Sequence, residues 1–160
     1  MERGLNRRKK FQRYRRKKQI QLSFVILWGL FLSVNIFTED LGQFLMSRSI
    51  RFKWVPNPDF SYFFNLYDLT TIHHGWVWVK LGHFIGFAIL NLLLYSWVRS
   101  HRIAITIAVA FAVSTELLQL FFGRDGRLYD IIVDSLGVLL DYYLLKKPSS
   151  FKSSIGRVIR

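Results

Sequence analysis

Cysteine is absent from this sequence, which excludes a disulfide scaffold, a zinc ribbon, a thiol nucleophile and an iron–sulfur cluster. Proline and glycine are scarce, at 3 and 10 residues, and aromatic residues reach 17%, so the chain is neither collagen-like nor disordered. Acidic residues are also few, because 10 Asp and Glu oppose 23 Lys and Arg and leave a net charge of +13. A length of 160 residues indicates one domain.

Long apolar runs separate the charged stretches. Four runs are long enough to cross a hydrocarbon core of about 30 Å as helices, and they cover residues 19–38, 81–98, 103–122 and 128–145. A cleaved signal peptide is the alternative for the first run, but the run is long and SVNIFTED offers no A-x-A-like cleavage site. The sequence therefore predicts an all-α, four-span transmembrane bundle over residues 19–147 with an outer loop at 39–80.

The fourth run is the weakest of these predictions. It contains Asp130, Asp134 and Asp141, and each Asp at the centre of a span costs about 2.5–3.5 kcal/mol on insertion scales. The run inserts if these carboxylates face protein or are protonated. Dropping it would place the basic C-terminal tail outside, which argues for keeping it.

The distribution of Lys and Arg predicts the orientation. With both termini inside, the inner segments hold 17 Lys and Arg and the outer segments hold six, in agreement with the positive-inside rule. We therefore expect a multi-pass membrane protein with both termini in the cytoplasm. Residues 148–160 form a basic cytoplasmic tail in this arrangement.

Residues 1–18 form a basic arm with ten Lys and Arg against one acid. Such a run binds either nucleic acid or anionic lipid. Because this one directly precedes a span, attraction to the anionic inner leaflet explains it, and Phe11 and Tyr14 are too few for a base-stacking platform. We expect membrane lipids as partners and no nucleic acid, and the sequence gives no oligomeric state.

The connections between the runs are of two kinds. Residues 99–102 and 123–127 are short, so the last three runs are predicted to be antiparallel neighbours. In the long outer loop, the spacing of Leu41, Phe44 and Leu45 predicts a short helix, and the aromatic residues from Phe60 to Tyr67 predict a segment lying on the headgroups. A disordered loop is the alternative.

Polar residues within the apolar runs converge on one depth. Pairs with helical spacing occur near the outer end of each of the last three runs, and two arginines lie in the turn between the last two. If the runs are antiparallel, these side chains fall in one slab of the outer leaflet. The candidate residues are Lys80, His83, Glu116, Gln119, Arg124, Asp130 and Asp134.

Two interpretations of this slab remain open. It is either a polar pocket that faces outward, with carboxylates opposite cations, or a network that docks three helices to one another. Asp141 lies deeper, where a Lys such as Lys146 is a candidate partner. The sequence contains no G-x-S-x-G, phosphate loop or H-E-x-x-H, and one His with carboxylates fixes no metal-ligand spacing. We therefore predict no catalytic residue, metal or cofactor.

The ordered motifs resemble the VanZ-like membrane family. They are Lys80-x-x-His83-Phe84-x-x-Phe87, Glu116-Leu117-Leu118-Gln119, Gly123-Arg124, Asp130 and Gly137. The chain differs from the family pattern at Val79, where the family often has Asp, and at Asp134, where it often has Asn. The resemblance implies a small bacterial polytopic membrane protein. It also implies the bacterial cytoplasmic membrane as the location of this protein. The founding member of the family is linked to low-level resistance to teicoplanin-type glycopeptide antibiotics.

The leading functional hypothesis is a protein without enzymatic activity whose polar cluster binds or shields a cell-envelope component. This hypothesis extends to an effect on susceptibility to glycopeptide or lipopeptide antibiotics. The alternatives are an intramembrane enzyme acting on a lipid-linked substrate and a structural subunit of a membrane complex.

Overall fold

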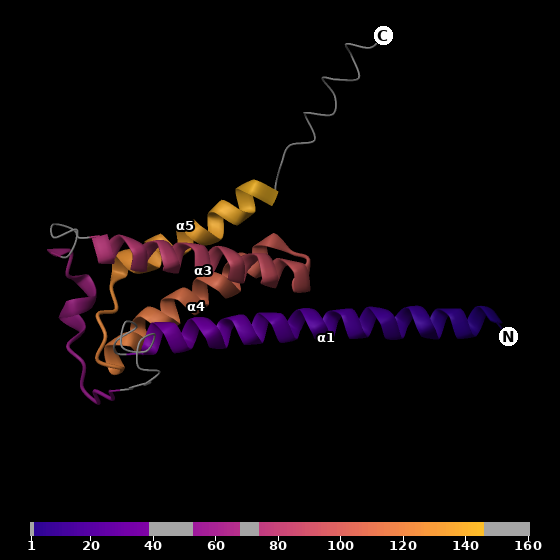
Figure 1. The fold of residues 1–160 in the computed structure, drawn as a ribbon, viewed down its shortest axis with the longest axis horizontal. Coiled ribbons are helices and arrows are strands. Elements are labelled where there is room, and N and C mark those ends of the chain that lie inside the picture. Colours follow the sequence, from indigo (N-terminus) through magenta and orange to yellow (C-terminus); the bar gives the residue numbers. More distant parts are fainter. Residues whose placement is uncertain (1, 39–52, 68–73, 146–160) are drawn as a thin grey trace, which may run out of the picture.

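The computed structural model describes residues 2–38, 53–67 and 74–145, and the regular secondary structure in these ranges is helical, without a strand (Figure 1). Four α-helices follow one another in the described residues: α1 (Glu2–Phe37), α3 (His74–Val98), α4 (His101–Phe121) and α5 (Leu128–Leu145). A short 3-10 helix, η1 (Phe60–Phe64), lies between α1 and α3 in the sequence. The prediction of an all-α protein is confirmed for these ranges.

Three of the described helices, α1, α3 and α4, are long and apolar enough to cross a membrane. Helix α5 has 18 residues, a length of about 27 Å, but it carries three Asp residues. All three lie buried against the rest of the protein, with Asp134 fully buried. Three of the predicted spans therefore meet the criteria of length and composition, and the crossing of α5 stays a prediction.

Helix α1 is much longer than its apolar run. It has 36 residues, about 54 Å, because the helix continues without a break through the basic arm. Arg, Lys and Gln are good helix formers and the arm contains no proline, so nothing in its sequence stops the helix. Figure 1 shows the indigo N-terminal part of α1 extending beyond the ends of α3 and α4.

The hydrophobic core lies where α3 packs against α1, α4 and α5. Helix α4 contributes a stripe of fully buried alanines with a spacing of four residues, which allows its neighbours to approach closely. The buried core residues are Leu32, Ile36, Phe87, Leu90, Leu94, Ala104, Ala108, Ala112 and Val138.

Helices α3 and α5 approach each other at Gly137. A Cβ added there would overlap the backbone carbonyl of Phe84, and a backbone atom cannot rotate away. We expect Gly137→Ala to separate the two helices and to lower the free energy of unfolding by about 1–3 kcal/mol. Thermal unfolding of the purified protein in detergent measures this. Gly29→Ala is the matched control, because its Cβ would meet nothing within 4 Å, and equal melting temperatures for the two variants would contradict the prediction.

The connection between α3 and α4 and the connection between α4 and α5 are both short. Arg99 and Ser100 alone join α3 to α4, with Arg99 at a φ of 61°. Helix α4 ends in a Schellman motif, in which the Gly123 N–H donates to the Leu120 carbonyl and the Arg124 N–H donates to the Gln119 carbonyl. Gly123 adopts the positive φ of 64° that this motif requires. The prediction that these helices are consecutive antiparallel neighbours agrees with their packing.

The described part of the segment between α1 and α3 packs against the end of α4. The Val55 N–H donates to the Phe121 carbonyl at 2.7 Å, and Trp54 stacks on Phe121. Helix η1 is capped by Asp59, whose carboxylate accepts from the Ser61 N–H at 2.8 Å, and this hydrogen bond lowers the pKa of Asp59. The short helix expected around residues 41–45 lies outside the described residues, and the position of this segment on headgroups stays a prediction.

Candidate functional site

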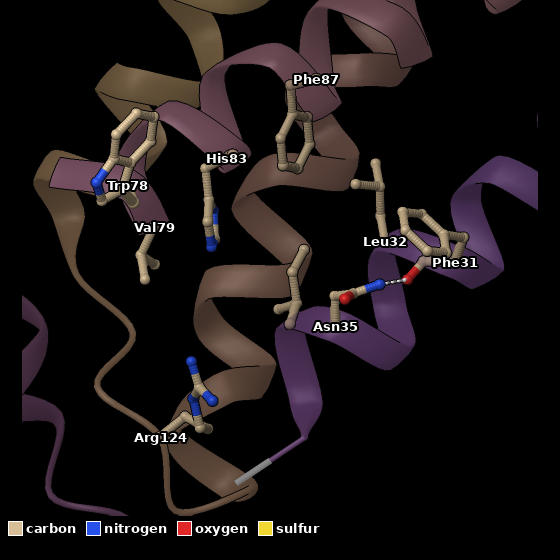
Figure 2. Close-up of a pocket in the computed structure, with 10 residues that line it drawn as sticks. Phe31, Leu32, Asn35, Trp78, Val79, His83, Phe87 and Arg124 are labelled. Carbon is tan, nitrogen blue, oxygen red and sulfur yellow. Dashed lines mark hydrogen bonds between the residues drawn. The ribbon is translucent and has the colours of Figure 1, made fainter. Parts of the chain in front are cut away.

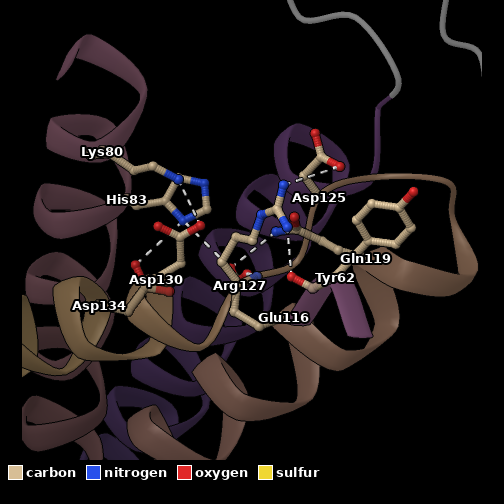
Figure 3. A network of polar contacts seen from close by, with 9 residues as sticks. All are labelled: Tyr62, Lys80, His83, Glu116, Gln119, Asp125, Arg127, Asp130 and Asp134. Atoms are coloured by element: carbon tan, nitrogen blue, oxygen red, sulfur yellow. Dashed lines mark hydrogen bonds and ion pairs between the residues drawn. The ribbon is translucent and has the colours of Figure 1, made fainter. Parts of the chain in front are cut away.

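A polar cluster forms at the end of the bundle where α3 begins, α4 ends and α5 begins (Figure 3). The antiparallel order of these helices brings their polar pairs to one level, as the sequence predicts. Each pair shares a helix face, because its members are three or four residues apart. The six residues of this polar cluster are Lys80, His83, Glu116, Gln119, Asp130 and Asp134.

Lys80 and Asp130 form the ion pair that connects α3 to α5. The Lys80 Nζ lies 2.6 Å from the Asp130 Oδ2, and the two side chains are 16% and 4% exposed. The same ammonium group lies 5.0 Å from the centre of the Tyr129 ring. The close approach of the ammonium group to the carboxylate compensates for the burial of Asp130.

Glu116 is the acceptor that ties α4 to the following loop. Its Oε2 accepts from the backbone N–H of Arg127 at 3.0 Å, and its Oε1 accepts from the Gln119 amide at 3.1 Å. Glu116 is fully buried, so these donors replace the water that a carboxylate would otherwise bind.

His83 lies between two carboxylates from different helices. Its Nδ1 is 3.3 Å from the Asp134 Oδ1 and 3.9 Å from the Glu116 Oε1. Asp134 is fully buried, and its Oδ2 has no hydrogen-bond partner among the residues that the structure describes. The arrangement therefore places two carboxyl groups from different helices around a single imidazole.

Arg127 belongs to this end of the bundle, although the sequence prediction names only Arg124 from the same turn. Arg127 is 5% exposed, and its Nη1 donates to the Tyr62 carbonyl of η1 at 2.6 Å. Gly126 makes this path possible, because a Cβ there would overlap the backbone carbonyl of Glu116. The sequence offers two Gly-Arg pairs in this turn, Gly123-Arg124 and Gly126-Arg127. Only the course of the loop shows that Arg127 is the buried arginine.

Arg124, which the sequence analysis places in the same slab, contacts the end of α1. The Schellman motif turns it towards the end of α1, where its Nη1 donates to the Thr38 carbonyl. Its side chain also lines a groove between α1 and α3, shown in Figure 2.

This groove has a volume of about 360 Å³ and is mainly apolar. His83 faces both the groove and the polar cluster, so the two are adjacent. The groove is lined by Phe31, Leu32, Asn35, Ile36, Trp78, Val79, Gly82, His83, Phe87 and Arg124.

Asp141 forms a separate pair deeper in the bundle. It accepts a hydrogen bond from the Asn91 amide at 3.0 Å, and the same amide donates to the Val138 carbonyl at 3.2 Å. Lys146, the partner considered from the sequence, lies outside the described residues. The partner that is present, Asn91, is neutral and fully buried.

The three candidate spans and the buried polar cluster at one end of the bundle define a helical membrane protein with ionisable groups in its interior. The profile of the VanZ/LLP1 family matches residues 19–151, and the chain belongs to this family. The resemblance noted in the sequence is thereby confirmed.

A relative in Bacillus subtilis (strain 168), described as the uncharacterized membrane protein YwnJ, is 36% identical over 124 residues. This match covers 75% of the present chain and 87% of the relative. No solved structure matches the chain.

Proposed function

We propose that this protein binds an anionic, lipid-linked component of the cell envelope in the groove between α1 and α3. The observation that carries the proposal is the composition of the groove, in which apolar walls lead to the guanidinium of Arg124 and the imidazole of His83. A volume of about 360 Å³ lies within the usual range of ligand pockets. Apolar walls suit a hydrocarbon chain, and a guanidinium group suits a phosphate.

The proposed setting is the bacterial cytoplasmic membrane, with four spans and both termini in the cytoplasm. The burial of all three Asp residues of α5 supports the fourth span, because their charges then face protein instead of lipid. In this orientation the groove and the cluster lie in the outer leaflet, and the basic part of α1 meets the anionic inner leaflet. A headgroup held in the groove is shielded from glycopeptide or lipopeptide antibiotics.

Filling the groove tests the binding proposal. Gly82 lines the groove, and a Cβ at this position would meet nothing within 4 Å, so Gly82→Leu adds a side chain there without a backbone clash. With undecaprenyl phosphate as the probe, we expect native mass spectrometry to show a one-to-one complex with the wild type and at least tenfold weaker binding to Gly82→Leu. Arg124→Gln should weaken binding of the phosphate but not of the neutral undecaprenol.

Gly29→Leu is the matched control, since its side chain also enters open space but its position does not line the groove. Equal binding by the wild type and Gly82→Leu, or equal loss in Gly29→Leu, would contradict the proposal. A lipid whose mass changes during incubation would instead indicate the intramembrane enzyme. In cells, Arg124→Ala should abolish any phenotype that complementation of a deletion strain restores, while the protein still inserts.

A further inference from the structure

We propose that His83, Glu116 and Asp134 form a binding site for one divalent transition-metal ion, such as Zn²⁺ or Mn²⁺. Each residue comes from a different helix, α3, α4 and α5, and each offers one ligand atom. This inference goes beyond the proposed function, because the ion needs no lipid in the groove.

The spacing of the three ligand atoms supports a shared ion. All three lie within 4.8 Å of one another, and His83 is 3.3 Å from Asp134 and 3.9 Å from Glu116. Two ligands that are each about 2.1 Å from one ion lie at most about 4.2 Å apart. Small rotations of the side chains therefore bring the three atoms to coordination distance.

The state of Asp134 is the independent observation that points to a ligand. Its side chain is fully buried, and its Oδ2 has no hydrogen-bond partner among the described residues. A buried polar atom of this kind is costly unless a cation or a donor satisfies it. The Nδ1 of His83 is likewise buried without a hydrogen-bond partner in the part of the chain that the structure describes, although it faces both carboxylates.

The balance of charge also favours a divalent ion. Lys80 already neutralises Asp130 at 2.6 Å. When both are ionised, the carboxylates of Glu116 and Asp134 carry two negative charges at this fully buried site, and a protonated His83 cancels only one of them. A divalent ion cancels both while a neutral imidazole coordinates it.

The donor set selects the class of metal. One imidazole nitrogen with two carboxylate oxygens suits Zn²⁺, Mn²⁺ or Fe²⁺, whereas Mg²⁺ and Ca²⁺ prefer oxygen ligands alone. Three protein ligands leave at least one coordination position for water or for an oxygen of an anionic ligand. His83 also lines the groove, so the proposed ion would lie next to a headgroup held there.

Metal binding by the purified, tag-free protein tests this inference. After removal of metals by chelation, Co²⁺ is added as the probe and followed by visible absorption and by elemental analysis. We expect one Co²⁺ per chain, with affinity at least about tenfold lower in His83→Ala and Asp134→Asn. Asp141→Asn is the control, because it changes a buried carboxylate on the same helix that belongs to a separate hydrogen-bonded pair.

Each result decides the inference. Stoichiometric Co²⁺ binding by the wild type and Asp141→Asn, but not by the ligand variants, supports it. If the wild type binds neither Co²⁺ nor Mn²⁺, the inference is wrong, and this conclusion does not depend on whether any variant folds. Gly82→Leu separates the two proposals, because this variant should lose the lipid and keep the metal.

Discussion

Replacement of Lys80 by methionine is expected to lower the free energy of unfolding by about 3–5 kcal/mol, because it leaves a buried carboxylate without its cation. Asp130 is only 4% exposed, and its Oδ2 lies 2.6 Å from the Lys80 Nζ. Methionine fills a similar volume to lysine, so the lower free energy of unfolding results from the missing charge and not from a cavity. Equilibrium unfolding in mixed detergent micelles measures it.

The opposite variant is the control for this prediction. In Asp130→Asn the remaining Lys80, at 16% exposed, is able to extend its ammonium group towards solvent, so we expect a smaller loss. The double variant Lys80→Met/Asp130→Asn should recover most of the stability that Lys80→Met loses. Equal losses in the two single variants, or no recovery in the double variant, would mean that the ion pair does not hold α3 against α5.

Glu116→Ala is expected to cause a loss of stability of similar size, for a different reason. It removes the acceptor of two buried donors, the Arg127 N–H and the Gln119 amide. Each unsatisfied buried donor costs about 1–3 kcal/mol, so we expect a loss of about 2–6 kcal/mol in the same unfolding experiment. Hydrogen exchange should also increase at Arg127, because its amide loses its partner.

Glu116→Gln separates the structural role of this residue from its functional role. The glutamine keeps an oxygen for the Arg127 N–H, so we expect less than half of the loss caused by Glu116→Ala. It removes the negative charge, however, and should still abolish complementation of a deletion strain. A Glu116→Gln protein that complements fully would restrict Glu116 to joining the helices.

Much of the fold could be predicted from hydrophobic run length alone. Helix α5 has the predicted bounds, Leu128–Leu145, and α4 begins and ends within two residues of its apolar run. Helix α3 begins at His74, seven residues before the predicted start at 81, because hydropathy detects a membrane-crossing stretch and not a helix that continues past it. For the same reason, hydropathy did not predict that α1 begins at Glu2 and includes the basic arm.

The candidate site was predictable where helical spacing and antiparallel order determine position. These two rules place the ionisable residues of the cluster at one level. These residues are Lys80, His83, Glu116, Asp130 and Asp134. The two rules cannot choose between Arg124 and Arg127, because that depends on the Schellman motif and on the close contact at Gly126. They also give no indication of the proposed metal site, because its three candidate ligands come from three helices and share no local spacing.

The two-residue link between α3 and α4 constrains how the protein is made. In the proposed four-span arrangement, these two helices are synthesised before α5, and their packing alone brings His83 beside Glu116. Helix α5 follows with three acidic residues and is a poor substrate for the translocon by itself. If α5 crosses the bilayer, we expect its insertion to depend on the hairpin of α3 and α4, whose Lys80 is the counter-ion of Asp130.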